Sequence, residues 1–369
     1  MFRRFFQGDW VLLSAAYLLL GVGLLTIYSL SGGFPQQNIF VRQMVFAALG
    51  TVFLISFPLF DYRHLSRLST PLYFLTMGVL AFVLVFGSTI RGTSGWIQFM
   101  GFQFQPVEFS KIVLIIFLAS FISQKRSELG DFVRLFASFV LTSILIVFVL
   151  KQPDLGSALV LAGIWFFMVL VSGIRKQHLV ILGTFFSAVI LASWFFLAPY
   201  QKDRISTFLH PDQDRQGSGY NVFQALVAVG SGGLSGKGLG HGSQSQFQFL
   251  PERHTDFIYA VVSEELGFVG AALVLFLFGV ILFRMVGAAL LAQDNFGYLL
   301  AMGIASMVFI QAVVNIGMNI GVLPVTGIPL PFLSYGGSSL LSVFLGIAIV
   351  QNIVARRREY ESHEWLGAQ

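Results

Sequence analysis

Four short polar segments interrupt an otherwise apolar sequence, and their residue types suggest acid–base chemistry or the binding of an anionic group. In FLPERHTDF, Asp256 stands at the predicted start of an apolar helix, with His254 two residues before it. A carboxylate at a boundary between water and membrane can act as a general base. The alternative is that Thr255 or Asp256 caps the helix and complements its dipole. Glu264 and Glu265 follow deeper in the helix, which is more carboxylate than a cap needs.

Two further segments, QFQPVEFSK and KQPDLGSA, contain charged residues beside apolar runs. The spacing of Glu108 and Lys111 places both on one side of a helix, within ion-pairing reach. A charge in a span costs about 2.5–3.5 kcal/mol on insertion scales, so this pair is interpreted as facing a wet cavity. An ion pair that reaches out to the membrane interface is the alternative. For Asp154, a functional role and ordinary turn or helix-capping chemistry both remain open.

The polar segment that contains FLPERHTDF begins with a short amphipathic stretch and a glycine run. Asn221–Val229 has an apolar face and predicts a short helix along the membrane surface. The run GSGGLSGKGLG resembles a phosphate cradle, but Ser231 replaces the first glycine of a P-loop, and Gly238 rather than Ser or Thr follows Lys237. Bare backbone amides with Lys237 could still hold a pyrophosphate. A flexible re-entrant loop is the alternative.

The last segment, Gly317–Ser339, has no formal charge but is rich in glycine and proline. Prolines cannot continue a helix, so part of this segment is predicted to be broken backbone lining a cavity enclosed by protein. We expect Pro329, Pro331 and Ser338 to form a wall of the site.

The composition is that of an integral membrane protein. Hydrophobic residues make up 56% of the chain and charged residues 11%, with a mean hydropathy of +0.80, whereas soluble domains have about 25% charged residues. The absence of cysteine excludes disulfides, cysteine-ligated zinc and a thiol nucleophile. The net charge of +5 is distributed as membrane topology requires, so it does not indicate binding of nucleic acid.

Apolar runs of about 20 residues predict an all-α polytopic bundle of ten transmembrane helices. The expected spans are Trp10–Leu30, Val41–Phe57, Pro71–Phe86, Pro106–Ile122, Phe132–Leu150, Leu155–Val171, His178–Leu197, Phe257–Phe283, Tyr298–Gly321 and Ser339–Val354. They form one membrane domain, residues 1–358, with a long extracytoplasmic loop, residues 198–256, between the seventh and eighth helices. Residues 359–369 have no apolar period and are expected to be a mobile end.

Basic residues predict the orientation. A cytoplasmic N-terminus puts most of them inside, including Arg3, Arg4, Arg63, Arg67 and Arg284. Both termini are then cytoplasmic, and all four polar segments lie on the outer face of the cytoplasmic (inner) membrane.

These segments carry a resemblance to a known family. QPVEFSK, KQPDLGSA, GYNVFQALVAVGSGGLSGKGLG, FLPERHTDFIYAVVSEELGF and NIGMNIGVLPVTGIPLPFLSYGGSS look like the signature segments of the SEDS family (shape, elongation, division and sporulation). The short chain and short termini look closer to the elongation branch, RodA, than to the division branch, FtsW.

The resemblance implies a peptidoglycan glycosyltransferase that polymerises lipid II, the undecaprenyl-pyrophosphate disaccharide peptide, during cell elongation and shape maintenance. It implies that Asp256 is catalytic and that the site also contains Arg42, Glu108, Lys111, Asp154, Arg204 and His254. Where family members often carry Arg-Trp-Ile, this chain has Gly95-Trp96-Ile97, so that arginine's role is absent or supplied by Arg91. Trp96 is expected on the cavity wall. The resemblance also implies a class B penicillin-binding protein as partner.

The implied chemistry inverts an anomeric centre. One base, Asp256, deprotonates the incoming sugar hydroxyl, and Lys111, Arg42 and Arg204 stabilise the departing pyrophosphate. We assign no metal site, although a divalent cation, Mg²⁺ or Mn²⁺, could share that task. A lipid II flippase would also need a polar cavity among the helices, and a non-catalytic scaffold for the cell-wall machinery would need no acid–base groups. Membrane lipids and lipid II are the expected ligands.

Overall fold

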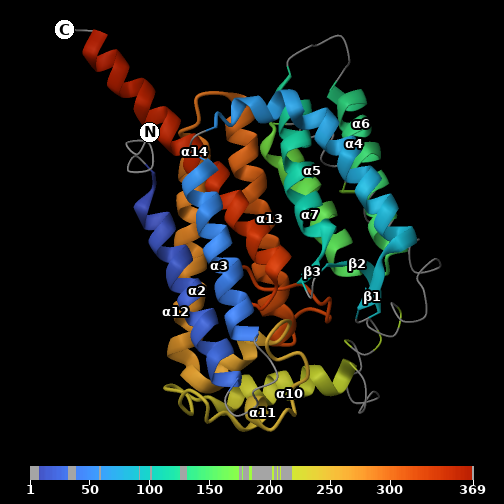
Figure 1. Ribbon diagram of the computed structural model, residues 1–369, viewed down its shortest axis with the longest axis vertical. Helices are drawn as coiled ribbons and strands as arrows, with labels where there is room; N and C mark the ends of the chain where they lie inside the picture. The colour runs from blue at the N-terminus through green and yellow to red at the C-terminus, as the bar shows by residue number, and fades with distance from the viewer. Residues whose placement is uncertain are drawn as a thin grey trace.

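The chain forms a bundle of long helices. The computed structural model describes residues 8–31, 39–57, 60–90, 92–99, 102–124, 131–173 and 218–367, with a few isolated positions between 174 and 217. Its helices are α2 (Trp10–Leu30), α3 (Ile39–Ser56), α4 (Arg63–Phe86), α5 (Pro106–Ser123), α6 (Asp131–Lys151), α7 (Leu155–Val171), α10 (Ser218–Ser231), α11 (Ser243–Gln246), α12 (Ile258–Leu290), α13 (Asn295–Asn319) and α14 (Gly337–Gly367). Most run along the long axis of the molecule, whereas α10 lies across one end (Figure 1).

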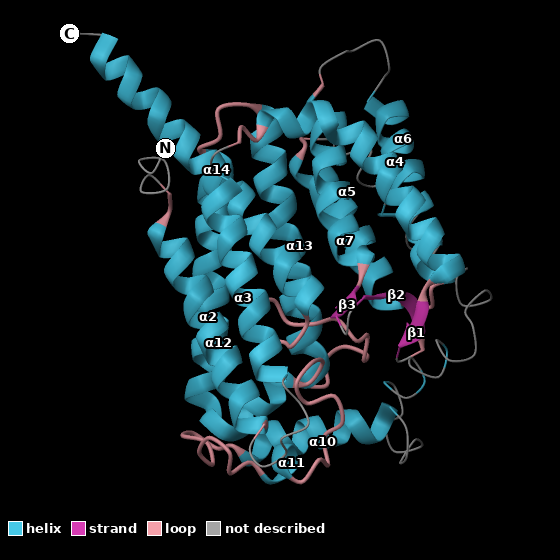
Figure 2. Ribbon diagram, viewed as in Figure 1, coloured by secondary structure: helices cyan, strands magenta, loops and turns pink. Residues whose placement is uncertain are grey.

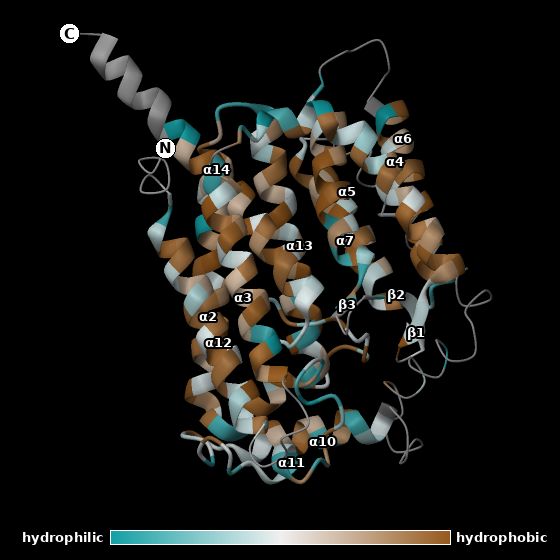
Figure 3. Cartoon of the chain, in the orientation of Figure 1, coloured by the Kyte–Doolittle hydropathy of each residue, from teal (hydrophilic) through white to brown (hydrophobic). Residues whose placement is uncertain are grey.

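The predicted all-helical polytopic architecture is confirmed. Among the described residues, 8 helices are long and apolar enough to cross a membrane, and α7 is a shorter apolar helix. Hydrophobic residues predominate along the middle of the bundle, and hydrophilic residues are more frequent toward its two ends (Figure 3). Apart from isolated positions, the predicted span His178–Leu197 lies outside the described residues, so the count of ten stays a prediction.

Two helices extend further than their apolar runs. Helix α4 begins at Arg63 rather than at Pro71, because Asp61 accepts a hydrogen bond from the Arg63 amide at 3.0 Å and Pro71 is accommodated inside the helix. Proline is tolerated in membrane helices where neighbouring groups satisfy the freed backbone. At the other end of the chain, α14 continues to Gly367, so the end predicted to be mobile is helical.

A small sheet that the sequence did not predict connects α4 to α5. It contains β1 (Ser88–Ile90), β2 (Thr93–Phe99) and β3 (Phe102–Phe104), paired antiparallel in chain order (Figure 2). The Ser94 amide bonds the Gln152 carbonyl at 3.3 Å, and the Gln152 side chain donates to the Leu80 carbonyl at 3.0 Å. The sheet therefore ties the start of α5 to the turn between α6 and α7.

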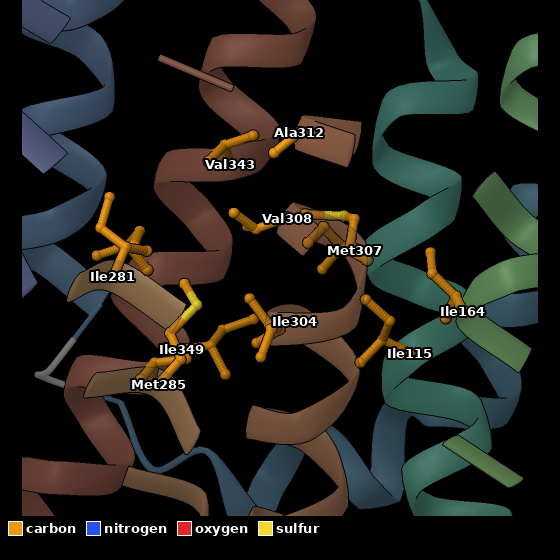
Figure 4. Close-up of a cluster of buried hydrophobic side chains, with 14 of the residues drawn as sticks. Ile115, Ile164, Ile281, Met285, Ile304, Met307, Val308, Ala312, Val343 and Ile349 are labelled. Carbon is orange, nitrogen blue, oxygen red and sulfur yellow. The ribbon is translucent and has the colours of Figure 1, made fainter. Parts of the chain in front are cut away.

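Helix α13 lies at the centre of the apolar core. Its buried Ile304, Met307 and Val308 are surrounded by side chains such as Ile115 of α5 and Ile281 of α12 (Figure 4). Gly303 allows close contact with α5, because an added Cβ would lie only 2.5 Å from the Ile115 side chain. A central helix packed on all sides is a rigid support for groups at its ends.

The short helix predicted at Asn221–Val229 is confirmed and is longer than expected, running from Ser218 to Ser231; its position along the membrane surface stays a prediction. Residues Ala225 and Ala228 of α10 are fully buried against Phe257 and Val261, in a cluster separate from the main core. This contact places α10 beneath the first turn of α12.

Candidate active site

Asp256 ends a series of turns that leads into α12, and its side chain is not the cap of that helix. The N-cap residue is Phe257, which offers no side-chain hydrogen bond. The side chain of Thr255 instead donates to the Glu252 carbonyl at 3.2 Å and the Glu252 carboxylate at 3.0 Å. Asp256 is half-buried, and a Cβ added to Gly327 would lie 3.5 Å from its Oδ2. The capping alternative therefore does not account for Asp256.

Asn319, the last residue of α13, caps α12 from outside. Its Oδ1 accepts from the Ala260 amide at 3.0 Å, and its Nδ2 donates to the Asp256 carbonyl at 3.0 Å. One turn earlier, Asn315 donates to the Asp256 carbonyl at 3.0 Å and the Ile328 carbonyl at 2.8 Å. Both asparagines are fully buried. They hold the backbone around Asp256 while leaving its carboxylate out of the capping role.

Replacing Asn319 with leucine should lower both stability and activity. The Ala260 amide would lose its partner, which costs about 1–3 kcal/mol for a buried group, and Asp256 would lose one of the donors to its carbonyl. Thermal unfolding in detergent measures the first effect and a polymerisation assay the second. Asn319→Asp, which keeps an acceptor for Ala260, should unfold at an intermediate temperature. Unchanged stability and activity in Asn319→Leu would contradict this role.

The proline-rich segment between α13 and α14 is irregular, as predicted, and it binds the turns before Asp256. The Tyr335 amide donates to the His254 carbonyl at 2.8 Å, and the Ser334 hydroxyl donates to the Thr255 carbonyl at 2.6 Å. Gln43 of α3 donates to the Ser334 carbonyl at 3.1 Å. In this segment Pro331 is buried and Pro329 half-buried. The wall predicted from the prolines therefore packs directly on the backbone that carries Asp256.

Glu108 and Lys111 form an ion pair inside the protein rather than at the membrane interface. The Lys111 ammonium lies 2.6 Å from Glu108 Oε1, and both side chains are buried. The second oxygen, Oε2, is buried without a hydrogen-bond partner among the described residues, as are both polar atoms of the Gln311 amide. Buried polar groups of this kind are costly in a low-dielectric interior. Neither side chain is open to water, so the pair does not face a wet cavity as expected from the sequence.

Asp154 caps a helix and also contacts the residue before α5. Its Oδ1 accepts from the Ser157 amide at 2.9 Å, which confirms the capping interpretation, and its Oδ2 accepts from the Gln105 side chain at 3.2 Å. The Gln105 amide in turn donates to the buried Ser338 hydroxyl at 2.9 Å. Gln105 thus joins the starts of α5, α7 and α14.

The glycine run forms hydrogen bonds with backbone groups of α12 where that helix is interrupted. Gly267 breaks the regular conformation of α12, with φ 67° and ψ −164°. The Lys237 and Gly238 amides bond the Glu264 and Glu265 carbonyls at 3.0 Å, and the Phe268 amide bonds the Gly233 carbonyl at 2.9 Å. The backbone groups freed at the break are therefore satisfied by the loop.

Side chains strengthen the same connection. The Lys237 ammonium lies 2.9 Å from Oε1 of the fully buried Glu264, and Glu265 accepts from the Ser29 hydroxyl at 2.6 Å. The Arg253 guanidinium donates to the Ser245 and Gln246 carbonyls. Burial lowers the pKa of Arg253, while Glu265 acts in the opposite direction. The backbone amides and the Lys237 ammonium predicted to hold a pyrophosphate instead bond to Glu264 and Glu265 of α12, so we do not assign Lys237 that role.

Gly236→Ala should loosen this loop. Gly236 has φ +79°, and an added Cβ would overlap the Glu265 carbonyl. A side chain where φ is positive costs more than about 1 kcal/mol. Limited proteolysis of the loop should accelerate. In the control Gly230→Ala, where nothing lies within 4 Å of the added methyl, cleavage should match the wild-type protein. Equal cleavage of both variants would refute the interpretation.

The remaining predicted site residues differ in how the structure places them. Arg42 is exposed on α3, beside the Gln43 that binds the proline-rich segment. His254 is half-buried with its ring 5.9 Å from that of Tyr335. Trp96 is half-buried on β2, and Arg204 lies outside the described residues.

The sequence interpretation missed Asn315, Asn319 and Gln105, although two amides four residues apart in an apolar helix are a signal for a polar site.

No protein ligand set for a metal is visible in the described part of the chain. Nowhere in those ranges do three or more His, Asp or Glu side chains come together in a way that could hold an ion. We therefore derive no step through a divalent cation.

Comparison with known proteins identifies extensive similarities. A family model described as "Cell cycle protein", for FtsW, RodA and SpoVE, matches residues 9–359. Stage V sporulation protein E of Bacillus subtilis is 40% identical over 361 residues, covering 94% of this chain and 96% of the relative. Peptidoglycan glycosyltransferase MrdB of Escherichia coli K12 is 36% identical over 354 residues, covering 95% and 94%. A chain of a solved peptidoglycan synthase complex, which coordinates polymerization and crosslinking, superposes with a TM-score of 0.81 at 32% identity, covering 95% and 98%.

Proposed function

The chain belongs to the FtsW/RodA/SpoVE (SEDS) family of cell cycle proteins and is a peptidoglycan glycosyltransferase, and on that premise we propose that it polymerises lipid II with Asp256 as the general base. In this reaction Asp256 takes the proton from the sugar hydroxyl of one substrate. The hydroxyl oxygen then forms the glycosidic bond to the anomeric carbon of a second substrate. The bond from that carbon to the undecaprenyl pyrophosphate breaks, and the diphosphate leaves with the electron pair.

The position of Asp256 is the observation that carries this proposal. Asn315 and Asn319 both donate hydrogen bonds to the Asp256 carbonyl. The Ser334 hydroxyl donates to the carbonyl of the preceding residue, Thr255. The carboxylate is half-buried and faces Gly327, a residue without a side chain. A base fixed in this way needs little reorganisation when the hydroxyl approaches. The partly exposed carboxylate can receive the proton.

We assign stabilisation of the leaving diphosphate to cationic side chains. We place Arg42 and Arg204 at the phosphates, because guanidinium groups bind phosphate oxygens with paired hydrogen bonds. The ammonium of Lys111 is closed off by Glu108, so we assign it an electrostatic role at a distance. Asp154, through Gln105, keeps the starts of α5 and α7 in register with the proline-rich segment. His254, Trp96, Pro329, Pro331 and Ser338 complete the proposed wall.

The test is a direct assay of the purified protein with lipid II, alone and with a class B penicillin-binding protein, with Asp256→Asn alongside. Glycan polymer from the wild-type protein and none from the variant supports the proposal. A flippase would instead move labelled lipid II across vesicle membranes equally well in both proteins, without polymer. A scaffold would do neither.

We further propose that the chain acts in cell elongation, with a class B penicillin-binding protein that supplies crosslinking. Similarity to the solved Rod shape determining protein RodA of Thermus thermophilus, at 32% identity and a TM-score of 0.70, supports the elongation role, and the similar chain in a complex that couples polymerization to crosslinking supports the partner. Expression in cells depleted of either their elongation or their division polymerase tests the first point. Rescue of division alone would refute it. Copurification of the two proteins tests the second.

A further inference from the structure

At the end of the bundle opposite to Asp256, one carboxylate joins three helices. Asp9 is buried and caps α2, its Oδ1 accepting from the Val11 and Leu12 amides at 3.1 Å. Its Oδ2 accepts from Nε of Arg284, on α12, at 2.7 Å and lies 2.6 Å from Nη2 of the same residue. Gln351 of α14 exchanges hydrogen bonds with the Asp9 backbone at 2.6 and 2.9 Å. Both carboxylate oxygens of Asp9 therefore have partners inside the protein.

A cavity of about 160 Å³ opens beside this junction. It is lined by Asp9, Arg284, Gly287, Ala288, Leu291, Val354 and Arg357. Among the described lining residues, one carboxylate faces two guanidinium groups, which gives these residues a formal charge of +1. No described residue accepts a hydrogen bond from Nη1 of Arg284, whose side chain is 38% exposed. The described lining is therefore cationic, and one donor edge of Arg284 remains after Asp9 is satisfied.

The surroundings of the cavity favour a lipid as the occupant. Ala288, Leu291 and Val354 give it an apolar wall, and Leu290 and Leu291 at the end of α12 are exposed to 70% and 49%. This is the end of an apolar span, where lipid headgroups meet water. A free anion would use only the guanidinium groups, whereas a phospholipid would also cover the apolar wall with its glycerol and upper acyl chain. Basic pockets between membrane helices bind anionic headgroups in this way.

We propose that the cavity lined by Asp9, Arg284 and Arg357 binds the phosphate headgroup of an anionic phospholipid. The lipid phosphate contacts the guanidinium groups of Arg284 and Arg357, and the glycerol backbone packs on Leu291 and Val354. A zwitterionic headgroup fits less well, because its own cation is placed beside the two arginines. Binding should link α2, α12 and α14 and stabilise the bundle without any contact to the glycosyltransfer site.

The experiment titrates the full chain in neutral detergent with phosphatidylglycerol, with phosphatidylcholine of identical acyl chains, and with inorganic phosphate. Bound lipid is counted by native mass spectrometry, and thermal unfolding is followed in parallel. Phosphatidylglycerol should bind more tightly than phosphatidylcholine and raise the unfolding temperature, and the difference should shrink as salt is added. Equal binding of the two lipids would overturn the proposal, and so would a matching shift from phosphate alone.

Arg357→Gln is the informative variant, because Arg357 is a half-buried residue of α14 that lines the cavity but is not part of the Asp9–Arg284 pair, so its loss leaves that pair intact. Phosphatidylglycerol binding should weaken roughly fivefold, the value expected for one basic residue at an anionic lipid surface. Arg67→Gln is the matched control, since Arg67 is an exposed arginine of α4 that does not line the cavity. Wild-type selectivity in Arg357→Gln, or an equal loss in Arg67→Gln, would contradict the assignment.

Discussion

Asp256→Asn is expected to slow lipid II polymerisation by about 100- to 10,000-fold, the usual contribution of a general base. The amide keeps the size of the side chain but cannot accept the proton from the sugar hydroxyl. Folding should be nearly unchanged, because the first turn of α12 is capped by Asn319 and not by Asp256. The measurement is the initial rate of glycan formation at saturating lipid II, together with thermal unfolding of both proteins.

The control for this prediction is lipid II binding. Asp256→Asn should bind the substrate with an affinity close to that of the wild-type protein, since the proposed phosphate contacts belong to other residues. A variant that makes long glycan strands at the wild-type rate would remove Asp256 from the mechanism. A variant that no longer binds lipid II would assign Asp256 to substrate binding instead.

Lys111→Met is expected to destabilise the protein by about 3–5 kcal/mol, the cost of leaving one member of a buried ion pair without its partner. Glu108 would keep a buried carboxylate whose Oε2 already lacks a hydrogen bond among the described residues. The uncompensated charge would lie at the start of α5, next to the Gln105 contacts with α7 and α14. Thermal unfolding in detergent should show a large decrease.

The double variant Glu108→Leu/Lys111→Met separates stability from function. Replacing both charges by apolar groups of similar size is often neutral or stabilising, so the unfolding temperature should recover much of the loss. Polymerisation should stay impaired, because the proposed electrostatic effect of Lys111 on the diphosphate is still missing. Full activity in the stable double variant would show that the pair only supports the fold.

The sequence predicted the fold well where apolar runs are long, and less well where the backbone is satisfied by distant residues. The start of α5 at Pro106 and the span Leu155–Val171 match the structure, because proline at a first helical position and a turn before Leu155 are local signals. The sheet between Ser88 and Phe104 was missed because its strands are short. The break at Gly267 was missed because its partners lie about 30 positions earlier in the chain.

The candidate site shows the same division. The polar segments could be placed at one end from topology alone, and the structure joins them through Gln105, Ser334 and Ser338. The sequence could not distinguish a capping Asp256 from a functional one, because the actual cap, Asn319, comes 63 residues later. It also assigned Lys237 to a phosphate, since the pairing with Glu264 depends on how the loop meets the break in α12.

The two asparagines at the end of α13 hold Asp256 and the proline-rich segment together as one unit. Asn315 connects the Asp256 carbonyl to the Ile328 carbonyl, so the proposed base and the proline-rich segment are both attached to α13, whose other end is capped by Asp294. A partner that pushes on that far end would displace both together and keep their separation. What would change is the spacing from this unit to α5 and α7, whereas the alignment of the proposed base with the proline-rich segment would be kept.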